Sequence, residues 1–487
     1  MALAELGLGP LGDSLEELRW TFESGKTRSI SWRKAQLQAL LNFLRDNEEQ
    51  ILEAIHEDVG KHRVEAFRDE VGVLIKSLTH NLDCLEKWVA PKKTKLPLAF
   101  FPATAELLPE PLGLVIIFSS WNFPMSLALE PLIGAISAGN TAVIKPSEIS
   151  PTCSSFLATV IPRYLDNKAI KVIEGGAAIA AQLLEEKWDK IFFTGSPRVG
   201  RIVMSAAAKH LTPVTLELGG KCPVVLDTRF SSSEMEVVVK RIAWGKWGLC
   251  NGQSCIGVDY VLVEEKSAFT LIGLLKKAIN KFYGKNTKEC NDYVRIINEH
   301  HFERLHKLIR DPEVANSIVH GGSVDKEKLF IEPTILLNPP LESEIMTEEI
   351  FGPFLPIITL KNIQQSAGFI KSRPKPLALY VFTKDETLKK LMISQTSSGS
   401  ITFNDVAFQF LSDSLPFGGV GQSGMGRYHG KFSFDEFTHE KAVLRRTLLL
   451  DLEPRYPPWN DFKLKFIRLL YKYDYFGLLL LLLGLKR

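Results

Sequence analysis

Residues 114–144 read LVIIFSSWNFPMSLALEPLIGAISAGNTAVI and decide the fold class. Leu114–Phe118 is a short apolar run rich in β-branched residues, which predicts a buried strand, and a loop follows from Ser119 to Pro124. Leu127–Ala138 has the composition of a buried helix, and Thr141–Ile144 predicts the next strand. A strand, a helix and a second strand form a βαβ unit. We therefore expect a parallel sheet whose ligands lie beyond the carboxyl ends of its strands.

The same alternation continues in both directions from this stretch. Apolar residues recur at helical spacing from about Leu15 to Leu85, and a further helix is predicted at Pro151–Tyr164. After Gly219 the pattern is repeated, which indicates a second α/β region. The additional strands are predicted at Ile170–Ile173, Ile191–Phe193, Val224–Leu226, Tyr260–Val263 and Ala378–Phe382.

The composition favours a globular protein that acts on a small molecule. The chain has 487 residues, of which 45% are hydrophobic and 24% charged, as expected for two or three folded domains. A formal net charge of +3 gives no reason to expect a nucleic-acid partner. Six cysteines without a CxxC pair favour neither a disulfide scaffold nor a metal site and indicate a reducing compartment. Met1–Pro10 lacks the features of an export signal, so we expect an intracellular protein.

Three segments carry side chains suited to catalysis. Glu217 stands close to two glycines, and Cys255 follows a glycine turn whose backbone amides can lower the pKa of a thiol. Asn122 lies in the loop at the carboxyl end of a strand, where its amide can face a developing oxyanion. Taken singly, each segment also fits a structural role, as a turn with a solvated glutamate, a buried inert thiol or a turn-forming asparagine.

In the order Asn, Glu, Cys, these segments resemble the aldehyde dehydrogenase superfamily. The resemblance spans about Leu15 to Arg446 and is nearest to the class 3 branch, which contains the fatty aldehyde dehydrogenases. Ala206–Pro213 is typical of that branch, and the C-terminal tail resembles plant members. Further matching segments are Ile144–Glu148, Phe193–Ser196, Glu348–Pro353 and Pro416–Gly419.

The resemblance implies a Rossmann-type parallel-sheet cofactor domain, a second α/β catalytic domain and a small bridging element, in a homodimer. We expect four segments: 1–216 for the N-terminal helices and NAD-binding domain, within which 91–112 belongs to the bridging element, 217–405 for the catalytic domain, 406–450 for bridging and oligomerisation, and 451–487 for an amphipathic and apolar tail.

The resemblance also implies the reaction, which is oxidation of medium- to long-chain aliphatic aldehydes to carboxylic acids. Cys255 is the implied nucleophile that forms a thiohemiacetal and then a thioester, and Asn122 is the implied oxyanion donor. Glu217 is the implied base for hydrolysis, a task favoured by a pKa raised through burial. Cys250 is the competing thiol, but the Gly-Gln-x-Cys spacing selects Cys255.

The implied cofactor is NAD, with NADP as the alternative. No Gly-x-Gly-x-x-Gly motif follows an early strand, so the dinucleotide is expected to bind differently. Lys145 and Glu148 match residues that bind the adenosine ribose, and Glu349 matches the anchor of the nicotinamide ribose. A carboxylate at Glu148 disfavours the 2′-phosphate of NADP. The other implied contacts are Trp121, Ser147, Phe351 and, at a helix N-terminus suited to the pyrophosphate, Gly195, Ser196 and Gly200.

The C-terminal tail has the composition of a membrane-surface segment. Basic residues alternate with aromatic and aliphatic residues in Phe462–Tyr475, and Tyr475–Leu485 is nearly all apolar. This end is shorter than the roughly 20 residues that span a bilayer, so we expect interfacial contact. The alternative is a helix that covers the substrate entrance or core of its own dimer. The expected location is the cytoplasm or the cytosolic face of an internal membrane.

Three other functions are left open by the residues alone. A Cys-His hydrolase would use Cys255 without a nucleotide, but Lys145, Glu148 and Glu349 would then have no task. A non-catalytic binding protein or membrane scaffold would not need Cys255, Glu217 and Asn122 together. A CoA-dependent acylating enzyme would not need Glu217 as a base that activates water.

Overall fold

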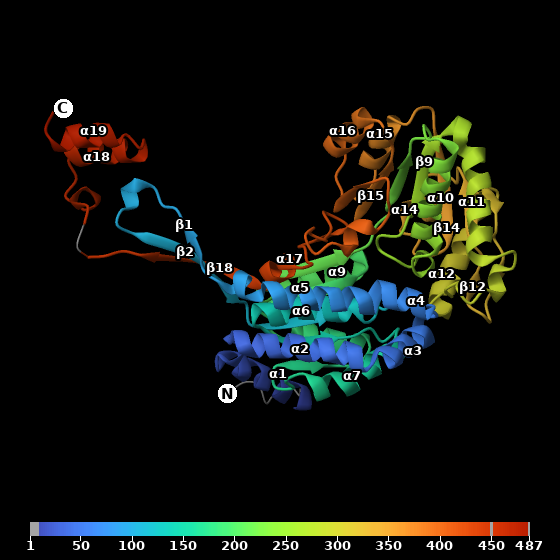
Figure 1. The fold of residues 1–487 in the computed structure, drawn as a ribbon, viewed down its shortest axis with the longest axis horizontal. Coiled ribbons are helices and arrows are strands. Elements are labelled where there is room, and N and C mark those ends of the chain that lie inside the picture. Colours follow the sequence, from blue (N-terminus) through green and yellow to red (C-terminus); the bar gives the residue numbers. More distant parts are fainter. Residues whose placement is uncertain (1–8, 449–450, 486–487) are drawn as a thin grey trace. The chain divides into compact units, whose positions relative to one another are not determined.

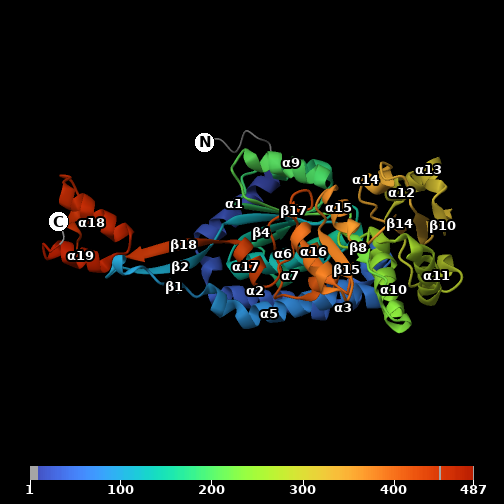
Figure 2. The same cartoon turned by 90° about the horizontal axis from the view of Figure 1, so that it is seen from above.

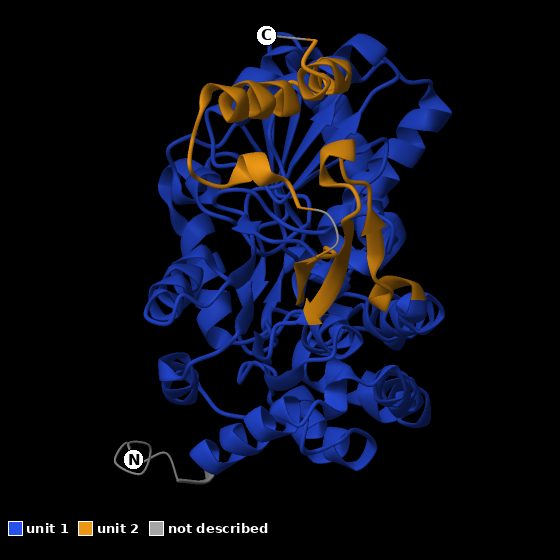
Figure 3. Cartoon of the chain, turned by 90° about the vertical axis from the view of Figure 1, so that its left-hand side faces the viewer, with its two compact units in different colours: residues 1–86, 111–437 blue, residues 87–110, 438–487 orange. Residues whose placement is uncertain are grey.

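The computed structural model describes residues 9–448 and 451–485, which form two compact units (Figure 3). The first unit comprises the residues up to Glu86 together with Pro111–Phe437. The second comprises Lys87–Glu110 and the residues from Thr438 onward. The prediction about an export signal concerns Met1–Pro10, nearly all of which lies outside the described residues, and it stays a prediction.

The helical character predicted for the N-terminal region is confirmed. Ser29 begins the second helix because its hydroxyl accepts a hydrogen bond from the Trp32 backbone N–H, and Gly60 ends the third in a left-handed conformation. The helices are α1 (Gly9–Glu23), α2 (Ile30–Asp46), α3 (Glu48–Val59), α4 (Arg63–Ala66) and α5 (Gly72–Val89), with one turn of π-helix at Phe67–Val71 between the last two.

The first unit contains the parallel sheet that the 114–144 stretch predicts, in the strand order β17-β7-β6-β3-β4-β5. Only the edge strand β17 is antiparallel to its neighbour. The strands are β3 (Leu114–Phe118), β4 (Thr141–Lys145), β5 (Ile170–Val172), β6 (Lys190–Gly195), β7 (Val214–Leu218) and β17 (Gly424–Met425).

Helices connect and cover this sheet, as the alternating sequence requires. Helix α6 is buried throughout and most of its residues are apolar, and Figure 1 shows it beside α2 and α5. Leu15 and Leu18 of α1 pack into the core that Ile116, Val143 and Ile191 form on the sheet. The connecting helices are α6 (Ser126–Ala138), α7 (Pro151–Tyr164), α8 (Ala177–Glu185) and α9 (Pro197–Ala208).

The second α/β region is also confirmed, as a seven-stranded sheet in the order β10-β13-β14-β9-β8-β15-β16, in which only β10 is antiparallel. Its strands are β8 (Pro223–Leu226), β9 (Tyr260–Glu264), β10 (Ile318–His320), β13 (Thr334–Leu337), β14 (Phe354–Leu360), β15 (Ala378–Phe382) and β16 (Ser400–Phe403), beside a ribbon of β11 (Val324–Asp325) and β12 (Phe330–Ile331).

Helices flank this second sheet, and Figures 1 and 2 show α10 and α11 beside it. Phe302 and Leu305 of α12 pack with Leu262 and Val381 in its core. The helices are α10 (Ser232–Trp247), α11 (Ala268–Tyr283), α12 (Glu299–Arg310), α13 (Pro312–Ala315), α14 (Glu344–Thr347), α15 (Gln365–Lys371) and α16 (Glu386–Gln395). A further helix, α17 (Lys431–Glu436), packs against α6 on the first sheet.

The second unit consists of a three-stranded sheet and two helices. The sheet has the order β1-β2-β18, from β1 (Lys92–Thr94), β2 (Thr104–Pro111) and β18 (Thr438–Arg445). Helices α18 (Asp461–Tyr471) and α19 (Tyr475–Leu482) pack together through Phe466, Leu478 and Leu481. In the described part of the chain, no helix has the length and hydropathy needed to span a membrane. The domain boundaries expected from the sequence stay predictions.

Candidate active site

Cys255 lies in the wall of a cavity in the first unit. The turn before it is held by Gln253, whose Nε2 donates to the backbone oxygens of Cys250 at 3.2 Å and Arg295 at 3.0 Å. The Oε1 atom of Gln253 accepts from the Ile297 backbone N–H at 3.1 Å. Gly252 has φ +76°, and a side chain there would overlap the Gly352 backbone, so this turn requires glycine.

Cys250 occupies a different environment from Cys255. Its side chain is completely buried and does not line the cavity. Its thiol donates to the Asn122 backbone oxygen at 3.6 Å, and its backbone N–H donates to Glu65 Oε1 at 2.8 Å. The structure therefore gives Cys250 structural contacts and gives Cys255 access to the cavity.

Glu217, on β7, lines the same cavity as Cys255. Its side chain is 3% exposed, and neither carboxylate oxygen has a hydrogen-bond partner among the described residues. The register places it opposite Thr194 of β6, a second lining residue whose hydroxyl also lacks a partner. Burial, and then repulsion from Glu436, raises the pKa of Glu217 well above its usual value. A carboxyl group kept buried without a partner is unusual in a folded protein and indicates a functional role.

The pKa of the Cys255 thiol is raised in the structure. The main cause is burial, followed by the negative charges of Glu349 and Glu217. Hydrogen bonds from the backbone N–H groups of Cys255 and Ile256 lower the pKa of this thiol, as expected for a cysteine after a glycine turn. Burial has the larger effect, so the pKa is raised overall. Burial also raises the pKa values of both glutamates, which favours their neutral forms and so weakens their repulsion of a thiolate.

Asn122 lies beside the loop of Cys255, between β3 and α6. Its side chain is 2% exposed, and its Nδ2 donates to the backbone oxygen of Gln253 at 3.0 Å. The next residue, Phe123, lines the cavity, whereas Asn122 itself does not. The structure thus brings Asn122 within one hydrogen bond of the turn that carries Cys255.

A buried ion pair fixes the Asn122 loop. Lys61 and Glu70 are both fully buried, and Lys61 Nζ donates to Glu70 Oε1 at 2.8 Å and to the Asn122 backbone oxygen at 2.8 Å. Glu70 Oε2 accepts from the backbone N–H groups of Met125 at 2.8 Å and Ser126 at 3.3 Å. The Lys61 ammonium also lies 3.8 Å from the centre of the Phe123 ring. The Lys61 ammonium and the Glu70 carboxylate therefore both contact the loop that carries Asn122 and hold it in place.

The walls of the cavity are mainly apolar, and Tyr428 and Trp244 present largely apolar rings. None of the described lining residues is a histidine, so a Cys-His hydrolase lacks its base here. The lining residues are Arg68, Asp69, Val73, Phe123, Ser126, Leu127, Thr194, Glu217, Trp244, Leu249, Ser254, Cys255, Ile256, Ala407, Phe408, Phe410, Leu411, Phe417 and Tyr428.

Lys145 and Glu148 form an ion pair at the carboxyl end of β4. Lys145 Nζ lies 2.7 Å from Glu148 Oε2, with the lysine side chain 4% exposed and the glutamate 46% exposed. The hydroxyl of Ser147 between them accepts from the Ile149 backbone N–H. Parallel-sheet proteins bind nucleotides at this end of their strands, so the position fits a ribose.

Glu349, Phe351 and Trp121 form a second candidate cofactor surface. Oε1 of Glu349 is buried without a hydrogen-bond partner in the described chain, and burial raises the pKa of this carboxyl group to about 8. A side chain at Gly219 would overlap the Glu349 carboxylate, so glycine is needed there. The ring of Phe351 packs edge-on against Trp121, with ring centres 5.4 Å apart.

The segment from Gly195 to Gly200 leads from β6 into α9, as predicted. Ser196 caps the helix, because its hydroxyl accepts from the Val199 backbone N–H at 3.4 Å. Gly200 is a packing position, since a side chain there would stand 3.0 Å from Leu218 of β7. The exposed N-terminus of α9 fits a pyrophosphate. With the unpartnered Glu349 oxygen, these residues fit a dinucleotide.

Comparison with known proteins identifies the family. The family model described as "Aldehyde dehydrogenase family" matches residues 16–443. The chain belongs to the aldehyde dehydrogenase family. It is 61% identical to "Aldehyde dehydrogenase family 3 member F1" of Arabidopsis thaliana over 98% of both chains, and 43% identical to "Aldehyde dehydrogenase family 3 member A2" of Rattus norvegicus over 92% of both. The solved structure "Substrate bound state of Staphylococcus Aureus AldH" superposes with a TM-score of 0.90, at 41% identity, covering 94% of this chain and 99% of that one.

These comparisons confirm several predictions made from the sequence. The resemblance to the class 3 branch and to plant members is confirmed, as is the aldehyde dehydrogenase fold. The protein is an enzyme of aldehyde oxidation, and the expected nicotinamide dinucleotide cofactor is confirmed for this family. The roles of individual residues stay predictions.

Sequence reasoning missed the residues that support the aldehyde dehydrogenase site. Lys61, Glu65 and Glu70 lie in a charge-rich helical region that looks like a solvated surface, yet they contact the loops of Asn122 and Cys250. Arg68 and Asp69 line the cavity and were likewise not predicted. Burial of these charges could not be read from the sequence, because it depends on contacts with loops that lie 55 to 185 residues further along the chain.

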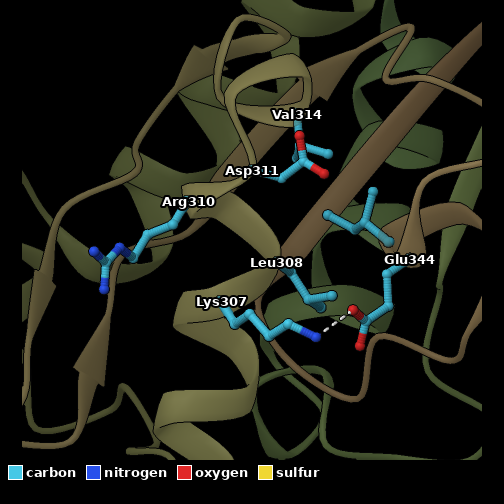
Figure 4. A pocket seen from close by; sticks show the side chains of 7 residues that line it. Lys307, Leu308, Arg310, Asp311, Val314 and Glu344 are labelled. Carbon is cyan, nitrogen blue, oxygen red and sulfur yellow. Dashed lines mark hydrogen bonds and ion pairs between the residues drawn. The ribbon is translucent and has the colours of Figure 1, made fainter.

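A second, surface pocket carries no predicted site residue. Figure 4 shows it between α12 and α14, where Lys307 and Glu344 form an ion pair at 2.8 Å. Arg310 and Asp311 lie at its border. Exposed ion pairs of this kind contribute little to stability. We assign the pocket no function.

Proposed function

We propose that the chain oxidises medium- to long-chain aliphatic aldehydes to carboxylic acids, with Cys255 as nucleophile and Glu217 as base. One observation carries this proposal. Cys255 and Glu217 line the same largely apolar cavity, and the Glu217 carboxyl group is held there without a hydrogen-bond partner among the residues that the structure describes. A nucleophile and a base that share a cavity can act on the same bound carbonyl carbon.

Covalent catalysis begins when the Cys255 thiolate adds to the aldehyde carbon and forms a thiohemiacetal. The oxyanion then needs donors about 3 Å away. The Cys255 backbone N–H is one candidate. The Asn122 amide is another: one N–H is used on the Gln253 oxygen, and the second would have to turn toward the cavity, which Asn122 does not line in this structure. The buried Lys61–Glu70 pair holds Asn122 for this task.

A bound dinucleotide would supply the hydride acceptor that oxidation of the thiohemiacetal carbon requires. Lys145 and Glu148 would hold its adenosine ribose and Glu349 its nicotinamide ribose. Cys255 then carries a thioester. Glu217 takes a proton from water, which attacks the thioester carbon, and the acid leaves with restoration of the thiolate. This step needs Glu217 ionised, which its buried position makes strongly dependent on pH.

Glu148 supports a preference for NAD over NADP. Its carboxylate stands half-exposed at the end of β4, where it would repel a 2′-phosphate, although its pairing with Lys145 reduces that repulsion. Initial rates of the purified enzyme with both cofactors test this preference. A clear preference for NADP would contradict it.

The second unit supports a proposal of membrane-surface contact. Apolar side chains of α18 and α19 are exposed, among them Phe462, Leu464, Phe476 and Leu479, while basic residues occupy the same segment. Such a segment binds at the interface of a bilayer without spanning it. We propose a homodimer in the cytoplasm or on the cytosolic face of an internal membrane.

The proposed activity is tested by NADH absorbance with straight-chain aldehydes of increasing length. We expect kcat/KM to rise with chain length, because each added methylene buries apolar surface worth roughly 0.8 kcal/mol. Aldehyde-dependent NADH formation that declines with chain length would contradict the substrate class. Complete absence of NADH formation would contradict the reaction itself.

A further inference from the structure

One ion pair lies in the wall of the aldehyde cavity, which is otherwise mainly apolar. Among its described lining residues, the charged side chains are Glu217, Arg68 and Asp69. Arg68 Nε lies 2.5 Å from Asp69 Oδ1, and Arg68 Nη2 lies 2.7 Å from Asp69 Oδ2, which is a bidentate pair. The Asp69 side chain is 10% exposed, so most of its surface is withdrawn from water. Bidentate pairs with this geometry are the strong class of charged contact.

A turn of π-helix brings this pair to the cavity. Arg68 and Asp69 are consecutive residues of the π-helix Phe67–Val71, and neighbours in sequence on an ordinary helix do not share a face. The wider turn lets both line the cavity, while the next residue, Glu70, points to the buried Lys61. Single π-turns inside helices are frequent at functional sites.

Arg68 is held by further contacts. Its Nη2 donates to the Gly248 backbone oxygen at 3.2 Å, and its guanidinium lies 5.1 Å from the centre of the Trp244 ring, another lining residue. These contacts fix the guanidinium at the wall, and Asp69 occupies the fork that would otherwise bind a carboxylate. The pair therefore contributes no net charge to the cavity.

We infer that Asp69 is a specificity-determining residue that reserves the cavity for uncharged aldehydes, by occupying Arg68. This inference rests on the proposed function. An aldehyde with a carboxylate at its far end would lose its hydration in the apolar cavity, would meet Asp69 as a like charge, and would find Arg68 already paired. Without the Asp69 charge, Arg68 becomes a fixed, bidentate site for such a carboxylate.

The test compares hexanal with 6-oxohexanoate, which has the same chain length and a terminal carboxylate. The measured quantity is the ratio of their kcat/KM values. We expect the unaltered enzyme to prefer hexanal by about tenfold or more. Asp69→Asn keeps the shape of the side chain and should raise the ratio of kcat/KM for 6-oxohexanoate to that for hexanal by about tenfold.

Two further variants separate charge from shape. Arg68→Gln with Asp69→Asn should lose the gain on 6-oxohexanoate, because the carboxylate then has no cation to bind. Glu49→Gln, in the exposed Arg63–Glu49 pair on the neighbouring helices, is the matched control and should leave both rates unchanged. Arg68→Gln alone leaves Asp69 unpaired and should disfavour 6-oxohexanoate further.

The measurements test the inference about Asp69 separately from the proposed function. Equal kcat/KM values for the two aldehydes with the unaltered enzyme would overturn the inference without any variant. So would an Asp69→Asn enzyme that oxidises hexanal normally and gains nothing on 6-oxohexanoate, or an Arg68→Gln enzyme that gains on it. If the unaltered enzyme oxidises neither aldehyde, the proposed function fails instead.

Discussion

At the scale of single residues, the two neighbouring cysteines differ by their surroundings. Cys255 lines the cavity, whereas Cys250 donates its thiol to the Asn122 backbone oxygen and is sealed in the core. We predict that Cys255→Ser abolishes aldehyde-dependent NADH formation. Cys250→Ser should keep most of it, because a hydroxyl can make the same hydrogen bond. Activity retained by the first variant and lost in the second would reverse the assignment.

Glu217 gives a prediction about pH. A base acts only when ionised, so hydrolysis of the thioester slows as pH falls through the pKa of Glu217. Because burial and Glu436 raise this pKa, the decline begins at a higher pH than for an ordinary glutamate. Glu217→Gln should lower kcat by about 10²–10⁴-fold and flatten the acidic limb of the pH profile.

Glu436→Gln provides the matched control for this profile. The substitution removes the negative charge of Glu436, which disfavours ionisation of Glu217. Lys190, the ion-pair partner of Glu436, keeps its positive charge. The acidic limb of kcat should therefore move to lower pH. A Glu217→Gln enzyme with the original rate and profile would show that another group is the base.

At the scale of elements, the loop that carries Asn122 is held from a distance by the Lys61–Glu70 pair. Lys61→Met alone leaves Glu70 buried and unpaired, which should cost about 3–5 kcal/mol of unfolding free energy in urea denaturation. Lys34→Met, in the exposed Lys34–Glu86 pair, should cost less than about 1 kcal/mol.

The catalytic role of this pair is separated from its structural role by a double substitution. Lys61→Met with Glu70→Gln removes both charges but keeps an oxygen that can accept from the Met125 and Ser126 N–H groups, so stability should recover in large part. The Asn122 carbonyl still lacks its Lys61 donor, so we expect kcat to stay reduced while KM changes little. Recovery of kcat together with stability would mean that the pair only stabilises the fold.

The strands could be predicted better than the supports of the site. Leu114–Phe118 matches β3 at both ends because a strand buried on both faces reads as an uninterrupted apolar run. The π-helix at Phe67–Val71 leaves no comparable pattern, since its charged residues point to different partners. Cys255 and Glu217 could be proposed from the sequence because each stands beside glycines, Glu217 at the end of a strand and Cys255 after a turn, whereas the contacts of Arg68 and Lys61 form only after folding.

At the scale of the whole molecule, the C-terminal helices should decide membrane binding. A protein that lacks residues 461–487 should lose binding to vesicles containing anionic lipid, because the exposed apolar side chains and the basic residues leave together. Co-sedimentation with vesicles measures this, and raised salt should weaken binding of the full chain. Equal binding with and without the tail would refute the proposal.

The covalent intermediate tests the central claim most directly. The Glu217→Gln enzyme, incubated with hexanal and NAD and then digested under acidic conditions, should yield the Cys255 peptide with the added mass of a hexanoyl thioester, because hydrolysis lacks its base. Cys255→Ser in the same background should show no adduct. A hexanoyl group on Cys250 or on another residue, or turnover without any adduct at Cys255, would contradict the account.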